Sequence, residues 1–142
     1  MTKLISVILT GGKSSRMDYE NKSFLKIKDK SFIEILTESL KYKSHEIIIN
    51  ANRDINKYKV FGYKVVCDKI DGYKGPLAGL HSAIDLYKNS KEDLWFALFP
   101  TDAPIINTGI IDNFFSITEK KNKVYICKID NIIEPMFSFW SS

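Results

Sequence analysis

The pattern of apolar and polar positions along the chain predicts strands and helices in alternation. Runs of mainly apolar residues, typical of strands buried on both faces of a sheet, lie at 3–9, 46–50, 63–67, 94–99 and 124–129, with a last extended segment at 136–140. A period of 3.6 residues predicts helices over about 32–42, from 75–76 to 89–90 and over 110–117, with a short helix within 51–60. Ser31 and Glu34 have the spacing of a capping box before the first helix. Residues 13–30 show no helical period and are expected to form a long loop with a short apolar stretch at 24–27.

This alternation favours one fold class. Strands that alternate with helices build a parallel sheet covered by helices on both faces. We therefore expect a three-layer α/β/α Rossmann-like sandwich with a mainly parallel sheet. No repeat, low-complexity tract or linker interrupts the pattern, so residues 1–142 are expected to form a single domain.

Composition indicates the cellular compartment and the class of ligand to expect. With 44% hydrophobic residues the chain can build a core, and its N-terminal apolar run at 4–9 is too short for a signal peptide or a membrane span. We expect a cytoplasmic protein with no membrane association. The net charge of +4 suits an anionic ligand, but the lysines are scattered, so no nucleic-acid partner is expected. Cys67 and Cys127 lie far apart in apolar runs and are expected to be buried, reduced thiols.

Polar and charged residues follow the predicted strands at their carboxyl ends, which is the edge where open α/β sheets bind ligands. These residues are Thr10 to Met17, Asn50 to Arg53, Asp68, and Thr101 to Pro104. Because parallel strands end at the same edge, one nucleotide could contact all four groups.

The first group has features of a phosphate-binding loop. Gly11 and Gly12 let the backbone approach phosphate oxygens with its amides. Arg16 and Lys22 add positive charge to the same segment. A triphosphate is the common ligand that needs both features, and a surface turn with incidental lysines is the alternative. A P-loop is excluded, because Val7 stands where that motif requires glycine.

Asp102 directly follows a predicted buried strand and is the candidate ligand of Mg²⁺, a hard cation that binds carboxylate and phosphate oxygens. A structural turn aspartate is the alternative. For Asp68, the equivalent residue after the third strand, a role as a helix or turn cap is equally open. Gly75, Pro76 and Leu77 open a predicted helix whose free amides could bind a base or a phosphate, although proline at a helix start is also ordinary capping.

Together these stretches resemble a known family. The signature Leu-x-Gly-Gly-x-Ser-x-Arg-Met at 9–17, followed by Lys22, is typical of nucleotidyltransferases with a glycosyltransferase-A-type fold. Among these, the chain is similar to the molybdenum cofactor guanylyltransferases. The matching stretches are Asn-Ala-Asn-Arg at 50–53, Asp68, Gly-Pro-Leu-Ala-Gly at 75–79, Phe-Pro-Thr-Asp-Ala-Pro at 99–104 and Glu-Pro at 134–135.

The resemblance implies an enzyme that transfers GMP from GTP to the terminal phosphate of molybdenum-bearing molybdopterin, releases pyrophosphate and uses Mg²⁺. It implies that Arg16 and Lys22 bind the triphosphate and that Asp102 binds Mg²⁺, as the catalytic set. With the helix start added, the nucleotide-binding residues would be Leu9, Thr10, Gly11, Gly12, Lys22, Asn50, Asp68, Gly75, Pro76 and Leu77. Molybdoenzymes or their chaperones would receive the product.

The chain departs from the family pattern at three positions and in length. Thr10 replaces the usual alanine, Asp18 the usual glycine and Asn21 the aspartate that usually precedes the lysine. The family continues with a further helix and a closing Asn-Thr-Pro-type segment, so this chain is expected to lack the C-terminal part. Two alternatives stay open: a cytidylyl- or sugar-phosphate nucleotidyltransferase on the same fold, and a non-catalytic protein that binds nucleotide or cofactor.

Overall fold

The computed structural model describes residues 1–11, 21–72, 75–117 and 119–142. Its elements follow in the order β1 (Lys3–Leu9), η2 (Lys22–Phe24, a 3₁₀ helix), β2 (Lys26–Ile27), β3 (Lys30–Ser31), α1 (Phe32–Leu40), β4 (Glu46–Asn50), α2 (Ile55–Lys59), β5 (Lys64–Val66), α3 (Pro76–Asp85), β6 (Leu94–Pro100), α4 (Gly109–Ser116), β7 (Val124–Ile129) and β8 (Ile132–Ser141). Within these residues, no helix is both long and apolar enough to cross a bilayer.

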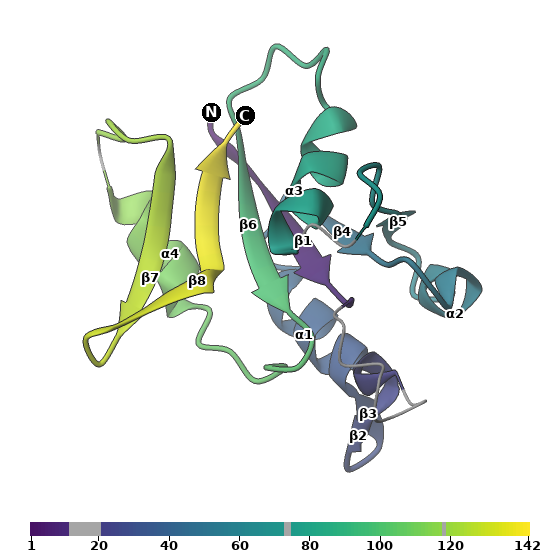
Figure 1. Cartoon of the computed structure of the whole chain (residues 1–142). Coiled ribbons are helices and arrows are strands. Elements are labelled where there is room, and N and C mark those ends of the chain that lie inside the picture. The colour runs from purple at the N-terminus through teal and green to yellow at the C-terminus, as the bar shows by residue number, and fades with distance from the viewer. Residues whose placement is uncertain (12–20, 73–74, 118) are drawn as a thin grey trace.

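A six-stranded sheet in the order β5-β4-β1-β6-β8-β7 forms the middle of the molecule (Figure 1). β5, β4, β1 and β6 are parallel, whereas β8 runs antiparallel to β6 and β7 antiparallel to β8. All of β6 and all but the first residue of β1 are buried, which explains why both segments are continuous apolar runs. The prediction of a mainly parallel sheet is confirmed.

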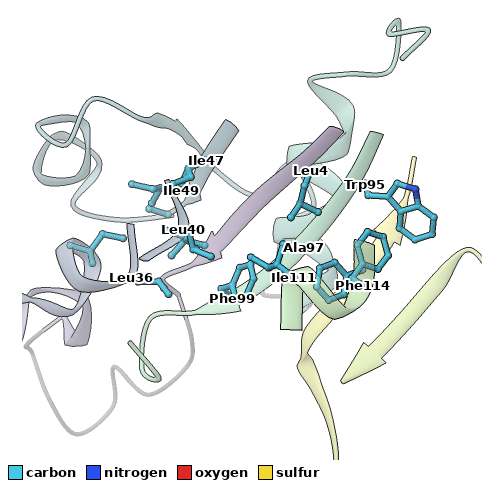
Figure 2. Close-up of a cluster of buried hydrophobic side chains, with 14 of the residues drawn as sticks. Leu4, Leu36, Leu40, Ile47, Ile49, Trp95, Ala97, Phe99, Ile111 and Phe114 are labelled. Atoms are coloured by element: carbon cyan, nitrogen blue, oxygen red, sulfur yellow. The ribbon is translucent and has the colours of Figure 1, made fainter. Parts of the chain in front are cut away.

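Helices cover both faces of this sheet, which confirms the predicted three layers. On one face Leu36 of α1, Tyr58 of α2 and Phe114 of α4 belong to one buried cluster with side chains of the strands. Figure 2 shows Leu36 and Leu40 of α1 near Ile47 and Ile49 of β4, and Ile111 and Phe114 of α4 near Ala97 and Trp95 of β6. On the other face Leu80 and Ala83 of α3 pack against β1, β4 and β6. Full burial of one leucine-sized side chain contributes roughly 1.5–3 kcal/mol, so the two clusters together account for much of the driving force for folding.

Helix α1 begins where the capping box predicts. The Ser31 hydroxyl accepts the Glu34 backbone N–H at 3.3 Å, and the Glu34 carboxylate accepts the Ser31 backbone N–H at 2.6 Å. That backbone hydrogen bond, with a second from the Ser31 hydroxyl, holds the pKa of Glu34 below its ordinary value. The helix ends at Leu40 rather than at about 42.

The described part of the segment between β1 and α1 contains more regular structure than the predicted loop. This part contains η2 and a hairpin of β2 and β3, joined by a turn in which Lys28 has a φ of 57°. Phe24 packs against Tyr58 of α2, with their ring centroids 4.8 Å apart. Strands of two residues are too short to leave a pattern in the sequence, which is why the prediction missed them. The rest of the predicted loop, 13–20, lies outside the described residues.

The prediction that both cysteines are buried is wrong for Cys67. Both thiols are free, but Cys67 is exposed and Cys127 is half-buried. β5 ends at Val66, so Cys67 lies just beyond the last paired residue of an edge strand. Cys127 packs against the cluster that holds α4, and this burial raises the pKa of its thiol.

Candidate functional site

The carboxyl ends of the parallel strands lie side by side and bring the predicted polar groups together. Leu9 at the end of β1 lies opposite Asn50 at the end of β4. One residue further on, the Thr10 N–H donates to the Asn50 carbonyl at 3.1 Å, and the Thr101 N–H donates to the Leu9 carbonyl at 3.1 Å. The ladder therefore extends past the strands and fixes the start of the loops that follow β1 and β6.

A cleft with a volume of about 310 Å³ lies at this edge, within the usual range for small-molecule sites. It is lined by Leu9, Thr10, Gly11, Asn21, Lys22, Arg53, Pro100, Thr101, Asp102 and Met136. The structure thus brings together five residues singled out in the sequence: Leu9, Thr10, Gly11, Lys22 and Asp102. Gly12 and Arg16 lie outside the described residues.

The charges in the cleft suit a metal-bound polyphosphate. Lys22 and Arg53 contribute positive charge and Asp102 a carboxylate, and all three residues are exposed. Arginine and lysine are the usual partners of phosphate oxygens. Mg²⁺ in proteins commonly takes one or two carboxylates plus substrate phosphates and waters. Among the described residues, no group of three or more His, Cys, Asp or Glu side chains could hold a metal ion.

Lys22 is held at the cleft by the turn in which it lies. Asn21 caps η2, and its Oδ1 accepts the Ser23 N–H at 3.1 Å. The buried Ser23 hydroxyl donates to Thr101 Oγ1 at 3.1 Å. The turn that carries Lys22 is therefore tied to the residue directly before Asp102.

The same asparagine also contacts the segment that carries Arg53. Asn21 Nδ2 donates to Asp54 Oδ2 at 3.1 Å and to the Tyr58 hydroxyl oxygen at 2.9 Å. Asp54 directly follows Arg53 and precedes α2 in the left-handed region, with a φ of 54°. The Tyr58 side chain is fully buried, so the hydroxyl group that Asn21 contacts is held in a fixed position.

Asp68 lies in a second hollow of about 200 Å³, lined by Asn52, Asp68, Ile70, Asp71 and Gly72. Its carboxylate accepts Asn50 Nδ2 at 2.8 Å and Asn52 Nδ2 at 3.0 Å, and its backbone N–H donates to Asn52 Oδ1 at 2.8 Å. The hollow adjoins the cleft, because a Cβ on Gly11 would lie 3.9 Å from Asn52 Nδ2. Each carboxylate oxygen keeps acceptor capacity for a ligand while two amides fix its direction.

Asn50, which holds the Asp68 carboxylate by a hydrogen bond, is itself buried. Its side chain is 5% exposed and also donates to the Val66 carbonyl at 3.3 Å. Helix α3 passes so close that a Cβ on Gly79 would lie 2.5 Å from Asn50 Oδ1. Asn50 thus acts on the second hollow through Asp68, and its direct contact with a nucleoside stays a prediction.

The three residues predicted at the start of α3 do open that helix. Gly75 has a φ of 75°, a conformation that favours glycine, and Pro76 occupies the first turn. Gly75, Pro76 and Leu77 are exposed and line neither of the two hollows described above. Their contact with a nucleotide remains a prediction.

Five cleft residues were not singled out as site residues in the sequence: Asn21, Arg53, Pro100, Thr101 and Met136. Arg53 did carry a signal, because it is one of two arginines and closes a polar group after a predicted strand. Met136 reaches the cleft only because β8 pairs with β6. That pairing depends on distant residues and leaves no local mark.

The chain matches known proteins over nearly its whole length. A family model described as a MobA-like NTP transferase domain matches residues 6–142. A Clostridium perfringens protein named "Probable molybdenum cofactor guanylyltransferase" is 36% identical over 140 residues, which are 99% of this chain and 67% of that protein. A "Molybdenum cofactor guanylyltransferase" of Vibrio campbellii is 30% identical over 134 residues, 94% of this chain and 66% of that protein. The chain spans about two thirds of the length of these relatives.

Solved structures share the fold. The "Molybdopterin-guanine dinucleotide biosynthesis protein A" of Archaeoglobus fulgidus superposes with a TM-score of 0.72 at 18% identity, over 96% of this chain and 67% of that one. Rv0371c of Mycobacterium tuberculosis superposes with a TM-score of 0.75 at 16% identity, over 99% and 71%. A structure titled as its complex with manganese gives a TM-score of 0.70 at 13% identity, over 99% and 71%. With the family model matched from residue 6 to residue 142 and a relative 36% identical, the chain belongs to the family of MobA-like NTP transferases.

Proposed function

We propose that this chain binds GTP in the cleft at the ends of β1 and β6 and transfers GMP to the terminal phosphate of molybdenum-bearing molybdopterin. The observation that carries the proposal is the position of Lys22, Arg53 and Asp102 around one cleft in a chain of this family. Relatives named molybdenum cofactor guanylyltransferase, 30–36% identical, support the choice of substrates. The product is the molybdopterin guanine dinucleotide cofactor, which molybdoenzymes or their chaperones would receive.

The reaction is a single in-line displacement. An oxygen of the acceptor phosphate attacks the α-phosphorus of GTP, the bond from that phosphorus to the bridging oxygen breaks, and the electron pair leaves with pyrophosphate. The acceptor is already an anion, so the residues need only position the phosphates and neutralise charge. Lys22 and Arg16 would bind the triphosphate, and Asp102 would hold Mg²⁺, which lowers the charge on the phosphates when bound.

Asp68 is the residue that we propose recognises the guanine base. Guanine presents an N1–H and an exocyclic amine side by side, and a carboxylate can accept both. Asn50 and Asn52 already hold the Asp68 carboxylate by its two oxygens. Adenine lacks this pair of donors, and an unpaired polar group in the site costs roughly 1–3 kcal/mol. We therefore expect GTP to bind about tenfold more tightly than ATP.

Two assays test this proposal. Calorimetric titration with GTP, ATP and CTP in Mg²⁺ buffer should rank GTP first, and pyrophosphate release should require molybdenum-bearing molybdopterin. Asp102→Asn should abolish release while the fold persists, and Asp29→Asn, an exposed aspartate in the β2–β3 turn, is the matched control. Equal affinity for CTP would replace the guanylyl assignment with the cytidylyl one. GTP binding without pyrophosphate release would indicate a non-catalytic nucleotide-binding protein.

A further inference from the structure

We propose that Asn21 is a positioning residue whose side-chain amide holds the turn of Lys22 against the turn of Arg53, so that both cations reach the phosphates of one nucleotide. The inference rests on the proposed function, because those phosphates belong to the triphosphate in the cleft. It concerns a position at which the chain departs from the family pattern described above, since Asn21 stands where an aspartate usually precedes the lysine.

Every polar atom of the Asn21 side chain is used within the described contacts. Its oxygen accepts the Ser23 N–H at 3.1 Å, and its nitrogen donates to Asp54 at 3.1 Å and to the Tyr58 hydroxyl at 2.9 Å. A primary amide offers both an acceptor and two donor hydrogens. An ionised aspartate could keep the first contact but could not donate to Asp54.

The contact joins two segments that are 33 residues apart in the sequence. Lys22 follows Asn21 directly and Arg53 precedes Asp54 directly, and both cations line the same cleft. The hydrogen bond between Asn21 and Asp54 therefore sets the separation of the two backbone positions from which the cations extend. Long, flexible side chains bind a shared anion at lower entropic cost when the backbone positions from which they extend are held in place.

An aspartate at position 21 would face the Asp54 carboxylate at hydrogen-bond distance. Two carboxylates that share a site repel, and one of them takes up a proton at a higher pH than usual. Lys57 Nζ lies 3.7 Å from Asp54 Oδ1 but is largely exposed, so it compensates weakly. Among the described residues, the Tyr58 hydroxyl also contacts Asn21, and Lys22 and Arg53 line the cleft together with this asparagine. Asn21 and Asp54 thus form a complementary pair whose members can be exchanged.

The test compares Asn21→Asp, Asp54→Asn and the double variant Asn21→Asp/Asp54→Asn. Titrations with GTP and with inorganic tripolyphosphate in Mg²⁺ buffer run from about pH 5 to about pH 8.5. Asn21→Asp should bind both probes about tenfold more weakly at the high end and recover toward wild type as the pH falls and the pair shares a proton. The double variant should bind within about twofold of wild type at the high end. Asn89→Asp, an exposed residue after α3, controls for the added charge.

Equal affinities of wild type and Asn21→Asp for both probes at every pH would overturn the inference, as would a loss that the double variant does not restore. Tripolyphosphate binding by a wild-type protein that does not bind GTP would contradict the proposed function and still decide the role of Asn21. If circular dichroism shows that Asn21→Asp does not fold, the affinity of the folded double variant alone decides the role of Asn21. Wild-type affinity then supports the exchange, and lost affinity refutes it.

Discussion

Replacing Gly79 by alanine is expected to destabilise the protein and to disturb the Asp68 hollow at the same time. Gly79 lies buried in α3, where the helix contacts β1 and β4. A Cβ there would lie 2.5 Å from Asn50 Oδ1 and 2.7 Å from Leu9 Cδ2. These neighbours are 5% and 6% exposed, so neither can swing into solvent to make room.

Two opposing effects set the size of the change. Alanine gains about 1 kcal/mol over glycine in a helix interior. Overpacking costs about 1–3 kcal/mol, and contacts below 3.0 Å place Gly79→Ala at the upper end of that range. We expect the free energy of unfolding to fall by about 1–2 kcal/mol. Because Asn50 Nδ2 holds Asp68 at 2.8 Å, a displaced Asn50 should also weaken GTP binding by about threefold to tenfold.

Urea denaturation measures the first effect and calorimetric titration the second. His81→Ala, at an exposed position of the same helix, is the matched control and should change stability by less than about 0.5 kcal/mol. A Gly79→Ala protein as stable as wild type, or more stable, would refute the reasoning. It would mean that the gain in helix propensity is not opposed by the close packing of α3 on Asn50.

Three other changes test separate parts of the structure. Ser31→Ala should lower the free energy of unfolding in urea by about 1 kcal/mol, because α1 loses its N-cap. Burial alone would raise the pKa of Glu46, but hydrogen bonds from Lys64 and Tyr87 outweigh burial and hold this pKa below its ordinary value. The lowered pKa therefore stabilises the fold above the ordinary pKa of the group, and this stabilisation is lost as the pH falls through the lower native pKa. Tyr87→Phe should therefore reduce the difference in unfolding free energy between about pH 7 and about pH 3. Iodoacetamide should modify the exposed Cys67 before Cys127, whose thiol pKa burial raises, as read by peptide mass spectrometry.

Each of these expectations has a contrary result. Unchanged stability of Ser31→Ala would show that the cap contributes nothing to α1. A wild-type acid dependence in Tyr87→Phe would show that the tyrosine hydroxyl does not help to hold the Glu46 carboxylate in its charged form. Faster modification of Cys127 than of Cys67 would contradict the exposures of the two thiols.

The parallel half of the fold could be predicted because each of its long strands is buried on both faces. β1 and β6 are therefore mainly apolar runs, and the capping box of α1 is a local signal. β8 is different, since it spans Ile132–Ser141 while only 136–140 was predicted as extended. Ile132 and Ile133 are exposed in the hairpin with β7, so they follow no pattern of burial. Their pairing comes from the turn that precedes them, in which Asp130 and Asn131 have positive φ.

The site was predictable as far as it depends on topology. The rule that ligands bind at strand ends selected the groups that contain Gly11, Arg53 and Asp102, and these residues line one cleft. Lys22, which lines the same cleft, was selected for its positive charge near the glycine loop. Asn21 was not selected, because its place depends on hydrogen bonds to Asp54 and Tyr58, which lie 33 and 37 residues away in the sequence. Such a contact is set by tertiary packing and has no periodic or compositional trace.

The position of β8 has a consequence for the newly made chain. β8 follows β7 along the chain, yet it lies between β6 and β7 in the sheet. Until residues 132–141 leave the ribosome, β6 has an open edge that can pair with other chains. Met136 of β8 also lines the cleft, so a nucleotide bound there would contact β8 and favour chains in which this strand has docked. Nucleotide binding would thus disfavour chains in which this edge of β6 is still open to aggregation.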